Sequence, residues 1–244
     1  MLDGIAERVG SITRSFVDIL DLGCFDGAFV PPPGARVARL DPGFAFARAA
    51  GGVQGDEDRL PFADGSFDLV VSAGVLDQVD DLPGALTLIR RVLRPDGLFL
   101  GCFVGSGSLP RLRAAWRAAE SERPVARAHP EIDVRAAGDL LVRAGFALPV
   151  ADVETLDVGY PDMGRLIDDL RGMATSNLMT GRIATTRGTF GAAAQAFAGD
   201  GGRVGERFNL VYLTGWAPDP SQPKPARRGS ATASLSAALR PPGD

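Results

Sequence analysis

The sequence has few metal-binding and redox-active side chains: two cysteines, Cys24 and Cys102, and one histidine, His129, among 244 residues. The cysteines lie in unrelated segments and have no metal-binding spacing, which excludes a structural zinc site, and we expect no metal at all. So little cysteine is typical of a reducing compartment, which predicts an intracellular, cytoplasmic protein.

The sequence also lacks a long apolar run and an excess of positive charge. No stretch reaches the roughly 18 uninterrupted apolar residues of a membrane span, and the opening MLDGIAERVG is neither a signal peptide nor a basic transit peptide. The net charge is −4, whereas a protein that coats nucleic acid normally needs a basic face. We therefore predict a soluble protein with no membrane span and no nucleic-acid partner.

Apolar runs that end in turn residues alternate with amphipathic segments along the body of the chain. The strands are apolar on both faces, which is typical of a mostly parallel sheet covered by helices on each side, so the predicted fold class is α/β. Strands are predicted over residues 16–23, 36–41, 67–75, 98–104, 148–158 and 207–216, and helices over 82–93 and 134–146, with more helical segments before the last strand.

The composition changes abruptly after Trp216. The last stretch, APDPSQPKPARRGSATASLSAALRPPGD, is rich in proline, serine and alanine and poor in core-forming residues, so residues 217–244 are predicted to be an extended or disordered tail. Residues 1–216 are predicted to form one domain, with an insert at about 159–206 before the last strand.

Three segments follow predicted strands, at the edge where a doubly wound sheet binds ligands. The first, DLGCFDG (residues 21–27), is a turn whose glycines let the backbone approach a ligand. Asp41 ends the next strand, where an acid can accept hydrogen bonds from both ribose hydroxyls. In the third, GDEDRLPF, Asp56 or Glu57 could accept a hydrogen bond from an adenine amino group. Together they predict an adenosine-containing ligand without separating NAD from S-adenosylmethionine (SAM), although the GxGxxG fingerprint of NAD sites is absent.

Three stretches, DLGCFDG, DEDRLPFADGSFDLVVS and ALTLIRRVLRPDGLFLG, follow one another across residues 21–101. In this order they resemble the class I SAM-dependent methyltransferases, specifically their type 11 branch. The resemblance implies a Rossmann-like fold, with a mostly parallel sheet of seven strands whose last strand is antiparallel, and SAM as the cofactor. The residues it assigns to cofactor binding are Asp21, Gly23, Cys24, Gly27, Asp41, Asp56, Glu57 and Ser72.

A narrower resemblance covers nearly the whole chain. AGDLLVRAGF, DLRGMATSN, the segment ending YLTGW, and QPKPARRGSATAS in the tail are similar to the methyltransferase-fold assembly factors of respiratory complex I. Mitochondrial members of that family are regarded as arginine hydroxylases, which implies a complex I subunit as partner and an arginine on it as substrate. The chain begins closer to its first strand than the family usually does, so we expect no N-terminal helix over the cofactor.

The sequence departs from the family where the chemistry is expected. Phe25 stands at the middle position of the family's GxGxG loop, and Asp26 adds negative charge near the expected place of the SAM carboxylate. Asp77 and Gln78 replace the His-Trp pair that commonly follows the fourth strand. Two functions stay open: a SAM-dependent methyltransferase that modifies a protein or a small molecule, and a non-catalytic assembly factor or chaperone with a degraded cofactor site.

Methyl transfer mainly requires alignment of the nucleophile with the methyl group, so no catalytic triad is expected, but a base near the acceptor would assist. The candidates for that base are Asp77, at the ligand-binding end of the sheet, and His129, in a segment that covers substrate in this fold; a helix cap and a structural histidine are the alternatives. Tyr160, Asp162 and Asn177 in the insert are candidate substrate residues; a solvated helix face is the alternative for Asp162, and a helix end running into a capped turn is the alternative for Asn177.

Overall fold

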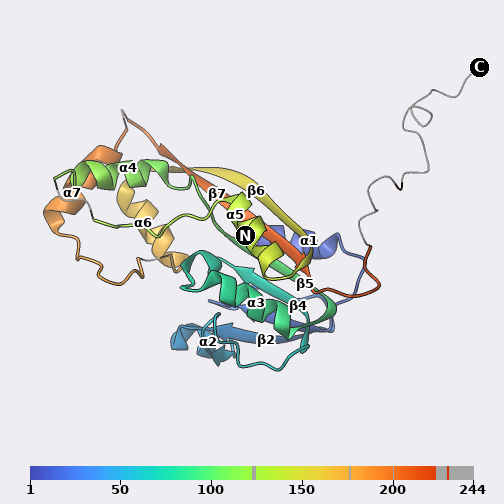
Figure 1. Cartoon of the computed structure of the whole chain (residues 1–244). Coiled ribbons are helices and arrows are strands. Elements are labelled where there is room, and N and C mark those ends of the chain that lie inside the picture. Colours follow the sequence, from blue (N-terminus) through green and yellow to red (C-terminus); the bar gives the residue numbers. More distant parts are fainter. Residues whose placement is uncertain (123–124, 176, 200, 224–229, 231–244) are drawn as a thin grey trace, which may run out of the picture.

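The computed structural model describes residues 1–122, 125–175, 177–199, 201–223 and 230. The helices are α1 (Leu2–Gly10), α2 (Phe44–Ala49), the 3-10 helix η1 (Leu76–Gln78), α3 (Leu82–Val92), α4 (Pro110–Ala119), α5 (Val134–Arg143), α6 (Met163–Gly172) and α7 (Arg187–Phe197). The strands are β1 (Asp18–Leu22), β2 (Arg36–Asp41), β3 (Val53–Gln54), β4 (Phe67–Ala73), β5 (Leu93–Val104), β6 (Ala147–Tyr160) and β7 (Val204–Trp216). Figure 1 shows the sheet crossing the molecule, with α2 beside β2 and with α4, α6 and α7 gathered at the other end.

The seven strands form one sheet in the order β3-β2-β1-β4-β5-β7-β6. β1 pairs in parallel with β2 and β4, and β4 pairs in parallel with β5. β7 is antiparallel to both of its neighbours, β5 and β6. The prediction of an α/β fold with a mostly parallel sheet and an antiparallel last strand is therefore confirmed. The strand order reverses at β1, and ligands bind beside such a point in open parallel sheets.

Both faces of the sheet are buried, because successive residues of a strand point to opposite sides. Ile19 and Leu69 pack in a core that includes residues of α1, α4, α6 and α7, whereas Leu20 and Val70 pack with α3 and α5. All four side chains are fully buried. Burial on both faces explains why these strands are continuous apolar runs rather than alternating ones.

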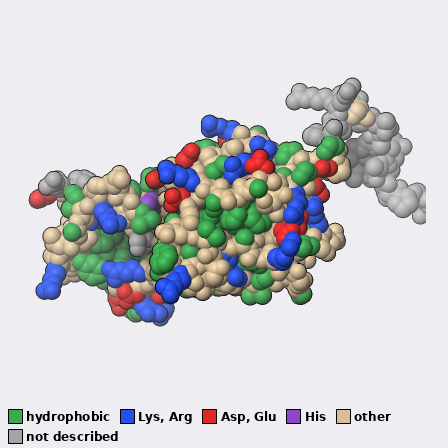
Figure 2. Space-filling view, turned by 90° about the horizontal axis from the view of Figure 1, so that it is seen from below, with side chains coloured by type: hydrophobic (Ala, Val, Ile, Leu, Met, Phe, Trp, Pro, Cys, Tyr) green, Lys and Arg blue, Asp and Glu red, His purple; other side chains and the backbone are tan. Residues whose placement is uncertain are grey.

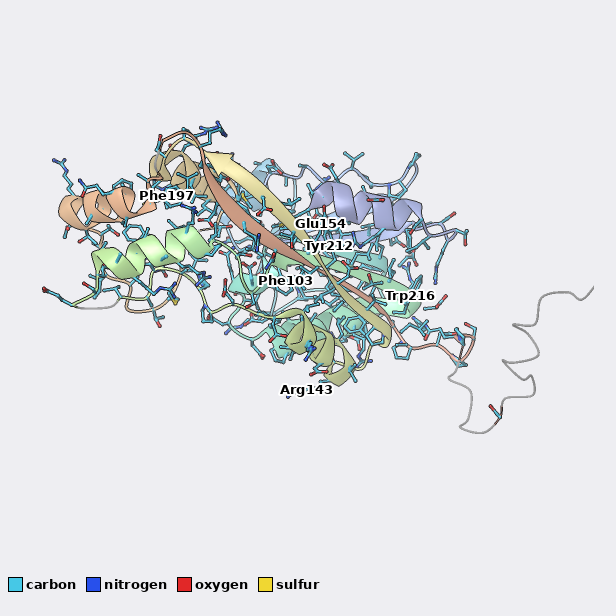
Figure 3. The ribbon with its side chains drawn as sticks, turned by 90° about the horizontal axis from the view of Figure 1, so that it is seen from above. Phe103, Arg143, Glu154, Phe197, Tyr212 and Trp216 are labelled. Atoms are coloured by element: carbon cyan, nitrogen blue, oxygen red, sulfur yellow. The ribbon has the colours of Figure 1, made fainter. Side chains whose placement is uncertain are left out.

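Helices α4, α6 and α7 are here called the helical lobe. A buried carboxylate of the sheet, Glu206, contacts the lobe at the start of α4. Phe197 is buried within the lobe, while Phe103 and Tyr212 are buried in the sheet (Figure 3). Glu206 of β7 is 1% exposed and accepts hydrogen bonds from the backbone N–H groups of Arg111 (3.2 Å) and Leu112 (2.8 Å). Such N–H groups in a first helical turn have no partner inside the helix, so Glu206 anchors α4 to the sheet.

Replacing Glu206 with alanine should lower the free energy of unfolding by about 2 kcal/mol or more, because buried N–H groups at the start of α4 would lose their acceptor. Glu206→Gln keeps one of the two oxygens and should lose less. Urea unfolding followed by circular dichroism gives both values. A Glu206→Ala variant as stable as the wild type would mean that the apolar face of α4 alone holds the lobe.

The expectation that no N-terminal helix covers the ligand site is wrong. Helix α1 packs on the sheet, where the guanidinium of Arg8 lies 3.7 Å above the centre of the Tyr212 ring and donates to Asp152 Oδ1 at 2.8 Å. Its first residues, Met1 and Leu2, border a cavity at the strand ends.

Two further differences concern β3 and β5. Strand β3 has only two residues and was not predicted, and β5 begins at Leu93, before the predicted strand at 98–104, with a register shift against β4. Among the described residues, no helix is long and apolar enough to cross a membrane. On the face in Figure 2, basic and acidic side chains are interspersed among hydrophobic ones.

Most of the predicted tail lies outside the described residues. At its start, Gln222 Nε2 donates to Asp96 Oδ1 and to the carbonyl oxygen of Ala217, both at 2.9 Å. The hydrogen bond to Asp96 ties the first tail residues to β5. The domain limits at 216 and the insert limits stay predictions.

Candidate cofactor and substrate site

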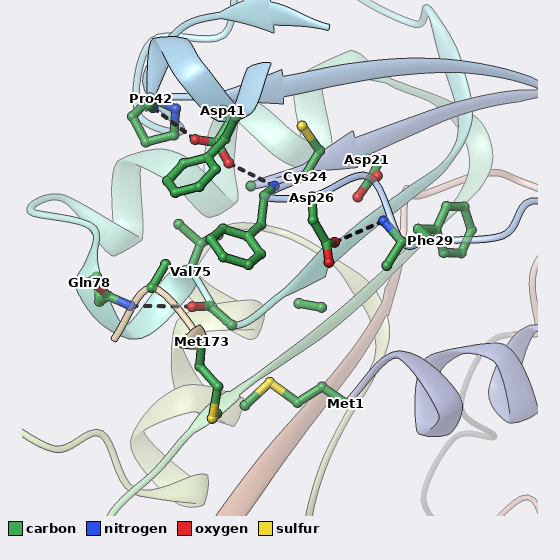
Figure 4. Close-up of a pocket in the computed structure, with 18 of the residues that line it drawn as sticks. Met1, Asp21, Cys24, Asp26, Phe29, Asp41, Pro42, Val75, Gln78 and Met173 are labelled. Atoms are coloured by element: carbon green, nitrogen blue, oxygen red, sulfur yellow. Dashed lines mark hydrogen bonds between the residues drawn. The ribbon is translucent and has the colours of Figure 1, made fainter. Parts of the chain in front are cut away.

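A cavity of about 750 Å³ lies beyond the carboxyl ends of β1, β2 and β4; we call it the strand-end cavity (Figure 4). Its walls come from the loop after β1, from Asp41 and the start of α2, from Glu57, from the segment after β4, and from the ends of α1 and α6. Small-molecule pockets of proteins commonly enclose about 300–1,000 Å³, so the strand-end cavity has room for a nucleoside-sized ligand.

The loop after β1 requires glycine at its first position. Gly23 has φ +71, and a Cβ added there would lie 2.4 Å from Cγ1 of Val75. Phe25 also has a positive φ, 46°, and its ring packs on Phe46 of α2 with 4.5 Å between ring centroids. The large side chain at the family's glycine position therefore forms part of the cavity wall and leaves the cavity open.

Asp41 is fixed in orientation by two backbone donors. Its Oδ2 accepts from the N–H of Phe25 and its Oδ1 from the N–H of Gly43, both at 2.8 Å. The side chain lines the cavity although the residue is 6% exposed. Since each carboxylate oxygen can accept more than one hydrogen bond, Asp41 retains acceptor capacity for ligand hydroxyls.

Two more carboxyl groups, Asp21 and Glu57, line the cavity with an oxygen that has no hydrogen-bond partner. Burial raises the pKa of Asp21 to about 6, although Arg39, with Nε 3.5 Å from Asp21 Oδ2, opposes the rise. Burial likewise raises the pKa of Glu57 to about 7. Asp21 Oδ2 faces Arg39, but buried polar atoms are rarely left unpaired in native proteins, so the Glu57 oxygen indicates a ligand that brings a hydrogen-bond donor or positive charge.

The other predicted cofactor residues are placed differently. Cys24 lines the cavity, and its burial raises the pKa of the thiol to about 11. Gly27 donates its N–H to the carbonyl oxygen of Cys24 at 2.7 Å and closes the turn without lining the cavity. Asp56 is exposed, Ser72 is fully buried in β4, and neither residue lines the cavity.

A second cavity, of about 510 Å³, lies between the end of β5, the helical lobe and residues 127–131 and 182–185; we call it the lobe cavity. Asp77, His129 and Asn177 all line it, although they are far apart in the sequence. Arg171, at the end of α6, lines both cavities. The predicted catalytic and substrate residues thus meet beside the strand-end cavity.

Asp77 is half-buried in the lobe cavity, and its carboxyl group has no ion-pair partner among the described residues. Its Oδ1 has no hydrogen-bond partner, and burial raises its pKa to about 7. By contrast, Glu131, the other acid in the lining, pairs with Arg113 at 3.1 Å. A carboxyl group in this state can accept a proton or pair with a cationic ligand near neutral pH.

His129 and Asn177 hold together the two segments that cover the lobe cavity. His129 Nε2 accepts from the N–H of Leu178 at 3.0 Å. Asn177 donates from Nδ2 to the carbonyl oxygen of Ala126 at 2.9 Å and accepts from the N–H of Met179 at 3.1 Å. In this geometry both side chains position backbone segments at the cavity.

Tyr160 and Asp162 lie outside both cavity linings. Tyr160 is buried in the core, where burial and then the neighbouring Asp169 raise its pKa. Asp162 caps α6 by accepting from the N–H of Arg165 at 2.8 Å. Ser176 of the DLRGMATSN motif lies outside the described residues.

Sequence reasoning does not identify two residues of the lobe cavity, Trp116 and Arg127. Arg127 pairs with Glu120, donates to Thr185 Oγ1 at 3.1 Å and has its guanidinium carbon 5.6 Å from the Trp116 ring centre. These contacts join segments about 60 residues apart, so no local pattern reports them. Among the residues that the structure describes, no group of three His, Cys, Asp or Glu is placed to hold a metal ion.

Comparison with known proteins supports the assignment of the fold. Residues 20–101, from β1 into β5, match the family described as "Methyltransferase domain". The YcgJ protein of Bacillus subtilis superposes with a TM-score of 0.63 and 15% identity, covering 89% of this chain and 98% of that one. Phosphoethanolamine N-methyltransferase 2 of Haemonchus contortus, solved in complex with SAM, superposes with a TM-score of 0.51 and 17% identity, covering 89% and 52%. The chain therefore has the Rossmann-like fold of the class I SAM-dependent methyltransferases.

Sequence similarity identifies the family within this class. "Arginine-hydroxylase NDUFAF5, mitochondrial" of Danio rerio is 36% identical over 250 residues, which cover 95% of this chain and 78% of that protein, and its human counterpart is 36% identical over 255 residues, covering 95% and 72%. The malonyl-[acyl-carrier protein] O-methyltransferase of Laribacter hongkongensis is 34% identical over 193 residues, covering 76% and 61%. The chain belongs to the family of the NDUFAF5 arginine-hydroxylases, which confirms the resemblance found in the sequence.

Proposed function

We propose that the chain binds SAM in the strand-end cavity and modifies an arginine side chain of a protein, on a subunit of respiratory complex I, in the lobe cavity. The observation that carries the proposal is the junction of the two cavities. Arg171 lines both, and the neighbouring residues Asp77 and Gln78 line the lobe cavity and the strand-end cavity respectively. A transferred group would therefore have a short path from one ligand to the other, as group transfer requires.

The strand-end cavity suits the adenosine part of SAM. Asp41 offers rigid acceptors for ribose hydroxyls, and Glu57 offers an unpaired oxygen to an amino group. The ring pair Phe25–Phe46 provides an apolar wall. When bound, SAM supplies a methyl group activated on a sulfonium.

The lobe cavity suits a guanidinium. Asp77 has a buried Oδ1 without a hydrogen-bond partner there, whereas Glu131 is paired with Arg113 and the Trp116 ring already faces the guanidinium of Arg127. Methylation of a guanidinium nitrogen releases a proton, which Asp77 is placed to accept. The relatives are named for hydroxylation of arginine. The mass of the modified residue therefore identifies the reaction, because methylation adds a methyl group and hydroxylation adds an oxygen.

One observation favours the alternative, a non-catalytic assembly factor. Phe25 holds a positive φ, a conformation that costs a non-glycine residue about 1–3 kcal/mol, at the point where the family's loop has glycine. A chain released from cofactor binding could accumulate such a residue. The cytoplasm, expected from the sequence, is part of our proposal; the relatives' names assign those proteins to mitochondria.

Calorimetric titration with SAM and with S-adenosylhomocysteine tests cofactor binding. The wild type should bind both, and Asp41→Ala should weaken both by about 100-fold, because the ribose hydroxyls lose a charged acceptor and the loop loses its anchor. Asp64→Ala, at an acid outside the strand-end cavity, is the control and should bind like the wild type. If a protein that melts cooperatively, and is therefore folded, gives no detectable heat with either ligand, the proposed SAM binding is wrong and the non-catalytic assembly factor is the remaining function.

A further inference from the structure

The strand-end cavity is strongly acidic for a ligand that carries a carboxylate. Four of its lining residues are acidic: Asp21, Asp26, Asp41 and Glu57. The amino-acid part of SAM has both an ammonium and a carboxylate group. The ammonium group finds acceptors here, whereas the carboxylate would be repelled unless a donor of positive charge lies within reach.

Most N–H groups of the glycine loop are already engaged within the protein. In many nucleotide sites the N–H groups of such a loop bind the anionic part of the ligand. Here five of them, over a loop that is described throughout, already donate within the protein at 2.7–3.1 Å. The donors are Gly23, Cys24, Phe25, Gly27 and Ala28, and the acceptors belong to Leu40, Cys24, Asp41 and Asp26.

Of the described residues that line the strand-end cavity, Arg171 is the one with a basic side chain. Its guanidinium lies 3.5 Å from Asp168, a long contact, and its side chain is 70% exposed. The arginines that line only the lobe cavity are engaged more firmly; Arg113, for example, pairs with Glu131 and also donates to a carbonyl oxygen. Arg171 is therefore free to turn towards a ligand at small cost.

The position of Arg171 matches the part of the cavity where an amino-acid group would lie. Figure 4 shows Met173, two residues further along the chain, beside Met1 on the side of the cavity opposite Asp41. If Asp41 holds the ribose, the chain that extends from the ribose reaches the side formed by α1 and the end of α6.

We propose that Arg171 binds the carboxylate of the cofactor's amino-acid part, a role that rests on the proposed binding of SAM. Arginine suits this role because its planar guanidinium can donate two parallel hydrogen bonds to a carboxylate. Since Arg171 also lines the lobe cavity, its turn towards the cofactor removes a positive charge from the substrate side.

The test compares SAM with decarboxylated SAM, which differs from it only by the carboxylate, using calorimetry on the full chain. The wild type should prefer SAM by about 10- to 100-fold, the range expected for a charge-assisted pair. In Arg171→Met this preference should disappear, because SAM binds more weakly while decarboxylated SAM binds at least as tightly as before. Arg171→Lys should recover part of the preference.

Arg165→Met provides the matched control, because Arg165 is on the same helix, pairs with Asp169 and lines neither cavity. It should keep the wild-type preference. An Arg171→Met variant that still prefers SAM would overturn the assignment, and so would an equal loss for both ligands. If the wild type binds neither ligand, the proposed function itself fails and this role fails with it.

Discussion

Asp77→Asn is expected to slow modification of an arginine-containing substrate by at least about 100-fold while leaving the affinity for SAM nearly unchanged. Asparagine has almost the shape of aspartate but neither accepts the proton nor pairs with the guanidinium, and a positioned base contributes roughly 100- to 10,000-fold. Asp77 has no hydrogen-bonded partner on Oδ1, so the substitution breaks no contact of that atom within the protein. The loss should therefore reside in the reaction and not in the fold.

The measurement is mass spectrometry of a synthetic peptide with a single arginine, and of partly assembled complex I, after incubation with the chain and SAM. Asp80→Asn, at an exposed acid in the same loop outside both cavities, is the matched control. A second readout is stability, because burial raises the pKa of Asp77 from 3.8 to about 7. An ionised Asp77 destabilises the folded protein above pH 7, so Asp77→Asn should melt higher than the wild type at pH 8. Unchanged turnover in this variant would remove Asp77 from the reaction.

The ligand-binding edge of the sheet could be predicted from the sequence because it is encoded locally. The apolar runs of β1 and β2 end in acidic residues and glycine, and in an open parallel sheet such ends meet at one edge. Asp41, predicted on this basis, and Asp21, assigned from the family resemblance, both line the strand-end cavity. Helix α1 carried a signal too, since Leu2, Ile5 and Val9 repeat at helical spacing and pack in or against one core.

The choice between neighbouring residues could not be predicted. Asp56 and Glu57 have the same chemistry, and the conformation of the loop decides that Glu57 enters the cavity while Asp56 faces solvent. Secondary-structure propensity does not determine the path of such a loop, because tertiary contacts select it.

The lobe cavity was even less accessible to prediction, since it is built by contacts between distant segments. The sequence indicated His129 and Asn177 separately, and only the hydrogen bond from Leu178 to His129 and that from Asn177 to Ala126 reveal that they hold two segments together. Likewise Arg171 belonged to a recognised motif, but its place between two cavities follows from how α6 packs.

Glu57→Gln is expected to stabilise the cofactor-free protein at pH 8 by up to about 3 kcal/mol. Burial raises the pKa of Glu57 from 4.5 to about 7, and each pKa unit corresponds to roughly 1.36 kcal/mol. Below pH 4.5 the side chain is protonated in both the folded and the unfolded protein. Between pH 4.5 and 7 the folded protein binds more protons than the unfolded one, so stability falls as pH rises. Glutamine does not titrate and avoids this loss.

The measurement is the difference in unfolding free energy between Glu57→Gln and the wild type, from urea titrations at pH 4.5, 6 and 8. The difference should be near zero at the lowest pH and largest at the highest. A constant difference across the range would mean that Glu57 is ionised throughout and that its oxygen is paired in solution.

The same substitution should weaken SAM binding at pH 8 by about tenfold, because a charged acceptor is replaced by a neutral one. Opposite effects on stability and binding would mean that Glu57 contributes to cofactor binding while it lowers the stability of the cofactor-free protein. Affinity of the wild type should rise between pH 6 and 8 as Glu57 ionises, and that rise should flatten in Glu57→Gln. If the variant instead gained stability and lost no affinity, the unpaired oxygen of Glu57 would not bind the cofactor. That result would favour the alternative function, an assembly factor without a cofactor.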